Sequence, residues 1–216
     1  MTESSSTKQK ILNVSLELFS THGFEATSLS QIAEAVGIRK ASLYSHFASK
    51  QAILDALLKI TLEEYDKHSI FAKADWDNPN FTKDKENITP DMAIQMIIGQ
   101  IHYILNDPQI CQARKILTIE QFQNSQMADL LTKQNYNDVM KFFNGMIRFL
   151  ISKGKLENLD TELMTAQFCL PISVWINLCD REPKRETEVM SLIERHVRHF
   201  FMVYEKNNLN LLREVK

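Results

Sequence analysis

The fold is decided by residues 26–50, which read ATSLSQIAEAVGIRKASLYSHFASK. Apolar residues recur there at helical spacing in two short segments that Gly37 separates. Thr27 or Ser28 can cap the first segment, and glycine is a common stop at the end of a helix. The second segment runs from Lys40 to His46. Two short helices joined by a tight turn that contains glycine predict a helix-turn-helix.

The second helix of this pair has the chemistry of a helix that reads DNA. In a helix-turn-helix it lies in the major groove, with its N-terminal residues toward the base edges. Two cations, a small residue and a hydroxyl open it here, namely Arg39, Lys40, Ala41 and Ser42. Groups that can reach a phosphate follow on Tyr44, His46 and Lys50. Spacing alone leaves open a second interpretation, a three-helix cap whose basic residues are only solvated.

Residue order favours the DNA interpretation. The run at 26–50, together with LFSTHGF at 18–24, closely resembles the N-terminal domain of TetR-type repressors over about residues 8–58. The family usually has glycine where this chain has Ala41, and this departure bears on how closely the helix approaches the groove. Beyond residue 60 only the order of the helices matches.

The resemblance implies DNA contacts at defined positions. Phosphate contacts fall on Thr27, Tyr44, His46 and Lys50, to which Ser28 and Gln31 add backbone or base-edge contacts. Base reading falls on Arg39, Lys40, Ala41, Ser42 and Ser45. Two such heads related by a two-fold axis would read a palindrome in double-stranded DNA.

The rest of the chain also predicts helices, and therefore an all-α fold. Gly and Pro number five each among 216 residues, and β-branched alternation is nearly absent. We expect about nine helices, three short ones in front and six longer ones behind, at residues 7–22, 28–36, 40–46, 49–65, 91–106, 109–121, 125–152, 160–180 and 186–207. Residues 72–90 read as a long loop with room for a short helical turn. Residues 1–50 would form the DNA-binding domain, and 51–216 a ligand-binding and dimerisation domain.

The last two helices are expected to form a homodimer. The resemblance implies that they pack with a second copy as a four-helix bundle. Their apolar stripes are compatible with this, and comprise Leu163, Ala166, Leu170, Val174 and Leu178 on one helix and Val189, Ile193, Val197, Phe200, Phe201 and Tyr204 on the other. The alternative is a core within one chain, which part of each stripe must supply.

The resemblance also implies a small-molecule effector. In the family, the middle helices enclose a pocket whose ligand weakens DNA binding by shifting the spacing of the two heads. Candidate lining residues, each of which can also be an ordinary core residue, are His102, Tyr103, Arg114, Phe122, Phe168, Cys169 and Trp175. Pro171 lies inside a predicted helix and denies an amide hydrogen bond to the Gln167 carbonyl, so we expect a kink there.

Composition restricts the other function classes. The net charge of −2 argues against non-specific nucleic-acid binding, although six Lys and Arg against five acids give residues 1–60 a net +1. Cys111, Cys169 and Cys179 form no close pair in the sequence, and we expect free thiols, with a redox sensor as the alternative. No apolar stretch reaches the length of a membrane span and the N-terminus lacks the core of a signal peptide, so we expect a cytoplasmic protein without a membrane partner.

Catalysis and metal binding find no support in the sequence. His196 and His199 have a spacing that metals can use, but no further ligands accompany them, so we expect neither metal nor cofactor. We find no nucleophile elbow, glycine-rich phosphate loop or HExxH motif. The sequence therefore predicts a DNA-binding regulator, a repressor released by a small molecule, and not an enzyme. Two alternatives stay open, an activator and a regulator controlled by a protein partner. A helical carrier or enzyme is less favoured, because it would not explain the first 50 residues.

Overall fold

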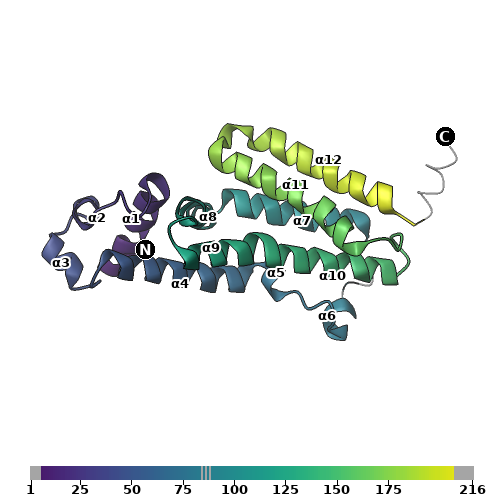
Figure 1. Ribbon diagram of the computed structural model, residues 1–216, viewed down its shortest axis with the longest axis horizontal. Coiled ribbons are helices and arrows are strands. Elements are labelled where there is room, and N and C mark those ends of the chain that lie inside the picture. The colour runs from purple at the N-terminus through teal and green to yellow at the C-terminus, as the bar shows by residue number, and fades with distance from the viewer. Residues whose placement is uncertain (1–5, 84, 86, 88, 207–216) are drawn as a thin grey trace, which may run out of the picture. The chain divides into compact units, whose positions relative to one another are not determined.

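The computed structural model describes residues 6–206 except 84, 86 and 88, and their regular structure is helical (Figure 1). Within this range no strand occurs, and an isolated antiparallel bridge joins Leu156 to Glu205. The predicted all-α class is therefore confirmed. The chain packs into two units. The first comprises the chain up to Ser69 together with Pro108–Leu131, and the second comprises Ile70–Asp107 together with the chain from Thr132 onward.

The first unit carries the helix-turn-helix. Its helices are α1 (Thr7–His22), α2 (Leu29–Val36), α3 (Lys40–Tyr44), α4 (Lys50–His68), α8 (Pro108–Glu120) and α9 (Ser125–Thr132). Ser28 and Gln31 form a capping box that starts α2, and Gly37 ends that helix with a φ of 79°. One apolar core joins these helices, and its largest buried members include Ile11, Phe19, Ile32, Leu43, Ile53, Leu54, Leu117 and Met127.

The second unit is built around a core rich in aromatic rings. Its elements are α5 (Ile70–Lys73), α6 (Pro79–Lys83), α7 (Pro90–Asn106), a π-helical turn (Lys133–Asn137), α10 (Asp138–Ser152), α11 (Thr161–Arg181), a 3₁₀ turn (Pro183–Arg185) and α12 (Glu186–Tyr204). Thr89 caps α7 ahead of Pro90, and Asp160 caps α11. The Phe168 ring of α11 lies 4.8 Å from that of Phe143 and 4.7 Å from that of Phe200, so the core ties α10, α11 and α12 together.

The packed units do not divide at residue 50. α4 packs against α1 and α8 within the first unit, and residues 108–131 return to that unit after a passage through the second. Part of the region expected to serve ligand binding therefore belongs to the same compact unit as the helix-turn-helix.

Helix boundaries differ from expectation in two places. The helix expected over 125–152 ends at Thr132, and a π-helical turn precedes α10. The turn reads KQNYN and contains neither glycine nor proline, so the sequence carries no local signal for a break there. α3 ends at Tyr44, where the His46 N–H bonds the Leu43 carbonyl three residues back instead of the Ser42 carbonyl four residues back. α6 is a short helical turn of the kind expected within the long loop. Asn207, the expected end of the last helix, lies outside the described residues.

α11 continues through Pro171. One turn before the proline, the Phe168 carbonyl lies 3.0 Å from Nε2 of His196 on α12. A carbonyl oxygen only accepts hydrogen bonds, so Nε2 carries the proton and donates. By length and composition alone α11 could span a membrane, but Phe168 and Ile172 are buried in the core of the unit. The kink at Pro171 stays a prediction.

Candidate nucleic-acid interface

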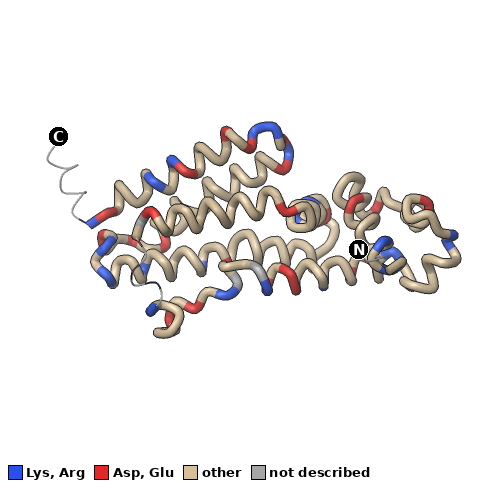
Figure 2. Tube along the Cα trace, turned by 180° about the vertical axis from the view of Figure 1, so that it is seen from behind, with Lys and Arg blue, Asp and Glu red and all other residues tan. Residues whose placement is uncertain are grey.

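Two buried side chains hold α3 so that its polar residues face outward. Leu43 is fully buried and Phe47 nearly so, and both belong to the core that α1, α2 and α4 share. Arg39 occupies the N-cap position of α3 with extended backbone. Arg39 and Lys40 are exposed, and neither forms an ion pair with any described residue. Their positive charges are therefore available to an anionic partner, at the end of the unit where Figure 2 marks basic positions in blue.

Most of the predicted DNA contacts are exposed on this part of the unit. These are Ser28, Gln31, Arg39, Lys40, Ala41, Ser42, Tyr44, Ser45 and His46. Ser28 and Gln31 use their side chains in the capping box, where the Gln31 side-chain oxygen accepts from the Ser28 backbone and hydroxyl, each at 2.8 Å. Their predicted DNA contacts stay predictions, and the structure adds a role in starting α2.

Thr27 and Lys50 differ from the rest, because both bond inside the turn between α1 and α2. Thr27 is 2% exposed, and its hydroxyl donates to the Gly23 carbonyl at 2.8 Å. In this conformation its hydroxyl is engaged away from solvent, so a phosphate contact would require a rearrangement. The Lys50 ammonium donates to the carbonyls of Phe24 and Glu25 at 2.6 and 3.3 Å. An ammonium has three hydrogens, so one is left for a phosphate.

A residue that the sequence did not single out completes this turn. Glu120, the last residue of α8, accepts a hydrogen bond from the Phe24 backbone N–H at 2.8 Å. The two residues are 96 positions apart, and no local pattern connects them. The sequence held one hint, since an acid at the C-terminal end of a helix faces the negative end of the helix dipole.

Comparison with known proteins agrees with this geometry. The family model described as "Bacterial regulatory proteins, tetR family" matches residues 11–57, which contain α2, α3 and the start of α4. Residues 11–57 therefore form a TetR-type DNA-binding domain. The match lies within the stretch over which the sequence resembles these proteins.

Two related proteins match this chain over stretches of very different length. It is 46% identical over 52 residues to IcaR of Staphylococcus aureus strain Newman, a "Biofilm operon icaADBC HTH-type negative transcriptional regulator". That match spans 24% of this chain and only 28% of the length of IcaR. To UidR of Escherichia coli K12, an "HTH-type transcriptional regulator", it is 23% identical over 172 residues, 80% of either chain.

Solved structures share the fold over nearly the whole chain. SmeT, "the repressor of the Stenotrophomonas maltophilia multidrug efflux pump SmeDEF", is similar with a TM-score of 0.62 and 16% identity, over 95% of this chain and 93% of SmeT. A TetR family transcriptional regulator from Pseudomonas syringae pv. tomato gives 0.59 at 17% identity, over 95% and 99%. Identities this low establish the fold alone.

The candidate effector residues of the TetR-type chain are distributed over both units. Arg114 and Phe122 lie in the first unit, where Arg114 is buried and Phe122 is 86% exposed. The other five lie in the second unit, where Phe168 and Cys169 are buried in the core, Trp175 is half-buried, and His102 and Tyr103 are exposed. The His102 ring lies 3.9 Å from Glu186 Oε1, at the surface. The assignment of these residues to an effector stays a prediction.

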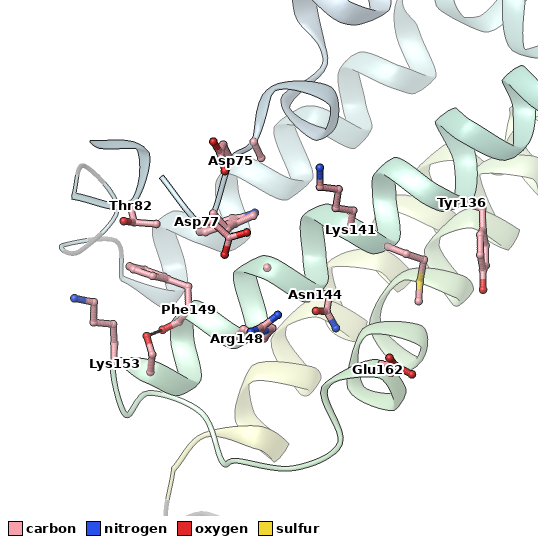
Figure 3. A pocket seen from close by; sticks show the side chains of 15 residues that line it. Asp75, Asp77, Thr82, Tyr136, Lys141, Asn144, Arg148, Phe149, Lys153 and Glu162 are labelled. Atoms are coloured by element: carbon pink, nitrogen blue, oxygen red, sulfur yellow. Dashed lines mark hydrogen bonds between the residues drawn. The ribbon is translucent and has the colours of Figure 1, made fainter. Parts of the chain in front are cut away.

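A cleft of about 830 Å³ opens in the second unit of the TetR-type chain, between residues 74–82 and one face of α10 (Figure 3). Its walls carry the rings of Trp76, Tyr136 and Phe149, and the charged groups of Lys141, Arg148, Lys153, Asp75, Asp77 and Glu162. Trp76 packs so close to Gly145 that a Cβ there would lie 2.3 Å from Cδ1 of the indole. None of the seven candidate effector residues is part of this lining. The sequence signal was an isolated tryptophan in an otherwise polar stretch.

Proposed function

We propose that the protein is a cytoplasmic transcriptional repressor that binds a palindromic operator as a homodimer and releases it when a small molecule binds. The observation that carries DNA binding is the exposed N-terminus of α3, where Arg39 and Lys40 have no acidic partner among the described residues. This helix end lies within the residues that match the TetR-family domain. It is suited to the major groove, where an arginine can form two hydrogen bonds with one guanine. Repression is favoured by the names of IcaR and SmeT, a negative regulator and a repressor.

Exposed apolar residues on α11 support the homodimer. Leu163, Leu170 and Val174 share one stripe of the helix and are 55%, 41% and 62% exposed. The apolar stripe expected on α12 is instead largely buried in its own unit, at Val189, Ile193, Val197, Phe200 and Phe201. Exposed apolar side chains that share one face of a helix favour an interface there. A second copy would cover the α11 stripe, and Val174→Glu should convert the dimer to a monomer in sedimentation analysis.

The cleft of the second unit supports a small-molecule effector of defined chemistry. Its size is in the range of ligand sites, and aromatic rings form part of its walls. Lys141 and Arg148 lie two turns apart on the face of α10 that lines it, and neither pairs with an acid in the described part of the chain. Asp75 and Asp77 on the facing segment would repel a second negative charge. We propose an aromatic compound with a single anionic group as the effector class.

DNA binding is tested by a mobility shift with DNA from upstream of the protein's own gene. The parent should shift this DNA, and Arg39→Ala combined with Tyr44→Ala should abolish the shift while leaving the helical content and the dimer intact. Arg181→Ala removes an exposed arginine from the end of α11 and serves as the matched control. If the double variant bound as well as the parent, the interface would be wrongly assigned.

Two alternatives, an activator and a regulator controlled by a protein partner, make different predictions for gene expression and for release of the DNA. A reporter fused to the regulated promoter should rise when the gene for this protein is deleted; a fall would identify an activator. An effector should release the DNA from the purified protein, whereas control by a protein partner would require that partner in the assay.

A further inference from the structure

The backbone of Phe24 is held from two sides by opposite charges. Its N–H donates to the Glu120 carboxylate at 2.8 Å, and its carbonyl accepts from the Lys50 ammonium at 2.6 Å. The same ammonium lies 4.2 Å from the centroid of the Phe24 ring, which packs edge-on against Phe19 with centroids 5.3 Å apart. Charge-assisted hydrogen bonds are among the stronger ones in proteins. Phe24 is therefore an anchor point of the turn between α1 and α2.

Glu120 occupies a costly place for a carboxylate. It is 7% exposed, it ends a helix, and it forms no ion pair with any described residue. Burial of an unpaired charge destabilises a fold, and an apolar residue of similar size is often the more stable choice. The carboxylate can approach because residue 23 is glycine: a Cβ there would lie 3.3 Å from Glu120 Oε1. The bond to Phe24 offsets this cost, but an apolar residue that fills the same space would not incur it.

The turn that Glu120 anchors leads directly into the DNA-binding helices. The Thr27 hydroxyl bonds back to Gly23, and the next residue, Ser28, caps α2. α2 in turn packs against α3, which carries Arg39 at its N-cap. A displacement at Phe24 would therefore move the start of α2 and, with it, the helix that faces the groove.

We propose that Glu120 is a positioning residue for DNA binding: its carboxylate fixes the Phe24 N–H and so sets the orientation of α2 and α3 toward the operator. This inference rests on the proposed function, since it assigns Glu120 a part in the DNA binding proposed above. Glu120 does not touch DNA in this scheme. It acts through the turn, from α8, which begins at Pro108, far beyond the end of α3 at Tyr44 in the chain.

The test compares three variants of the full chain in two assays. Glu120→Ala removes the acceptor, Glu120→Gln keeps an uncharged acceptor oxygen, and Asp129→Ala removes an exposed carboxylate from α9 as the matched control. The assays are hydrogen–deuterium exchange of the Phe24 amide, and fluorescence anisotropy with a duplex that the parent selects from a random library. Thermal melting and sedimentation check folding and the dimer.

Glu120→Ala should exchange the Phe24 amide at least tenfold faster and bind the duplex about tenfold more weakly, the loss expected for one hydrogen bond to a charged acceptor. Glu120→Gln should restore both values to within about threefold of the parent, and Asp129→Ala should equal the parent. If Glu120→Ala does not fold, Glu120→Asp replaces it, because a carboxylate one methylene shorter does not reach the amide.

Faster amide exchange with unchanged DNA affinity would overturn the proposal, since the bond would then be structural only. Equal loss of affinity in Glu120→Ala and Glu120→Gln would also overturn it, because the acceptor oxygen would not be the cause. If the parent itself selects no duplex, the proposed function fails, and this inference fails with it. A parent that binds while Glu120→Ala binds equally well refutes the inference alone.

Discussion

Replacing Gly23 by alanine should damage the first unit more than the same replacement of Gly37. Both residues have positive φ, 85° and 79°, but they differ in ψ and in their surroundings. Gly37 has ψ 32°, the left-handed helical conformation, and nothing lies within 4 Å of a Cβ built there. Gly23 has ψ 161°, a region that glycine alone adopts readily, and a Cβ would press on Glu120. The two replacements therefore differ both in backbone strain and in their effect on the Phe24 anchor.

The magnitudes follow from these two environments. Gly37→Ala should lower the free energy of unfolding by about 1 kcal/mol, the cost of left-handed backbone for an L-residue. For Gly23→Ala the backbone cost is about 1–3 kcal/mol, and displacement of the Glu120 carboxylate weakens a bond worth about 1.5–3 kcal/mol. We expect a total loss of about 3 kcal/mol. With a urea slope of about 3 kcal/mol per molar, the midpoint should fall by roughly 1 M.

Two probes in one urea titration can tell the units apart. Both tryptophans, Trp76 and Trp175, lie in the second unit, so their fluorescence follows that unit, whereas far-UV circular dichroism follows all helices. In Gly23→Ala the dichroism transition should begin at lower urea while the fluorescence transition changes less. A Gly23→Ala transition that coincides with that of Gly37→Ala would refute the reasoning, because neither the greater backbone strain at Gly23 nor the Glu120 contact would then affect stability.

Three other outcomes are expected. Leu43→Ala removes a fully buried side chain under α3 and should lower the free energy of unfolding by about 2–5 kcal/mol. Operator binding should then be lost at temperatures where the second unit is still folded. Unchanged binding at those temperatures would contradict the role of Leu43. Burial raises the pKa of the Cys169 thiol from 9.0 to about 12, so the native thiol stays neutral where the unfolded one ionises. Stability should therefore fall as the pH rises from about 9 toward 12, and Cys169→Ser should remove that slope in a pH series of urea titrations. In a Trp175→Phe background, anilinonaphthalene sulfonate, an aromatic monoanion, should quench Trp76, and Arg148→Gln should weaken this titration; equal titrations would exclude the cleft as the anion site.

Local rules predicted the helix-turn-helix because each of its features is encoded within a few residues. Ser28 begins α2 by capping it, Gly37 ends it with left-handed backbone, and Leu43 repeats the apolar spacing that buries one face of α3. The exposed basic residues then follow from the helical period. Such signals need no knowledge of the rest of the chain.

Features that depend on distant segments could not be read in the same way. The Glu120 bond to Phe24 joins residues 96 positions apart, and the engagement of Lys50 with the same turn spans 26. The apolar stripes predicted that α11 and α12 are buried on one side, but not which apolar residues face outward. Leu163 and Val174 are exposed, whereas Val189 and Val197 are in the core. Packing decides that choice, and periodicity is blind to it.

The salt dependence of operator binding tests the central claim most directly. Two copies of Arg39, Lys40 and Lys50 would bring six cations to the phosphates and bases, which predicts a slope of log affinity against log salt of about −5. Fluorescence anisotropy with DNA from upstream of the protein's own gene, between about 50 and 200 mM salt, measures it. A slope near −5 that becomes shallower in Arg39→Ala is the predicted result. Affinity that does not change with salt would contradict the assignment of this surface to DNA.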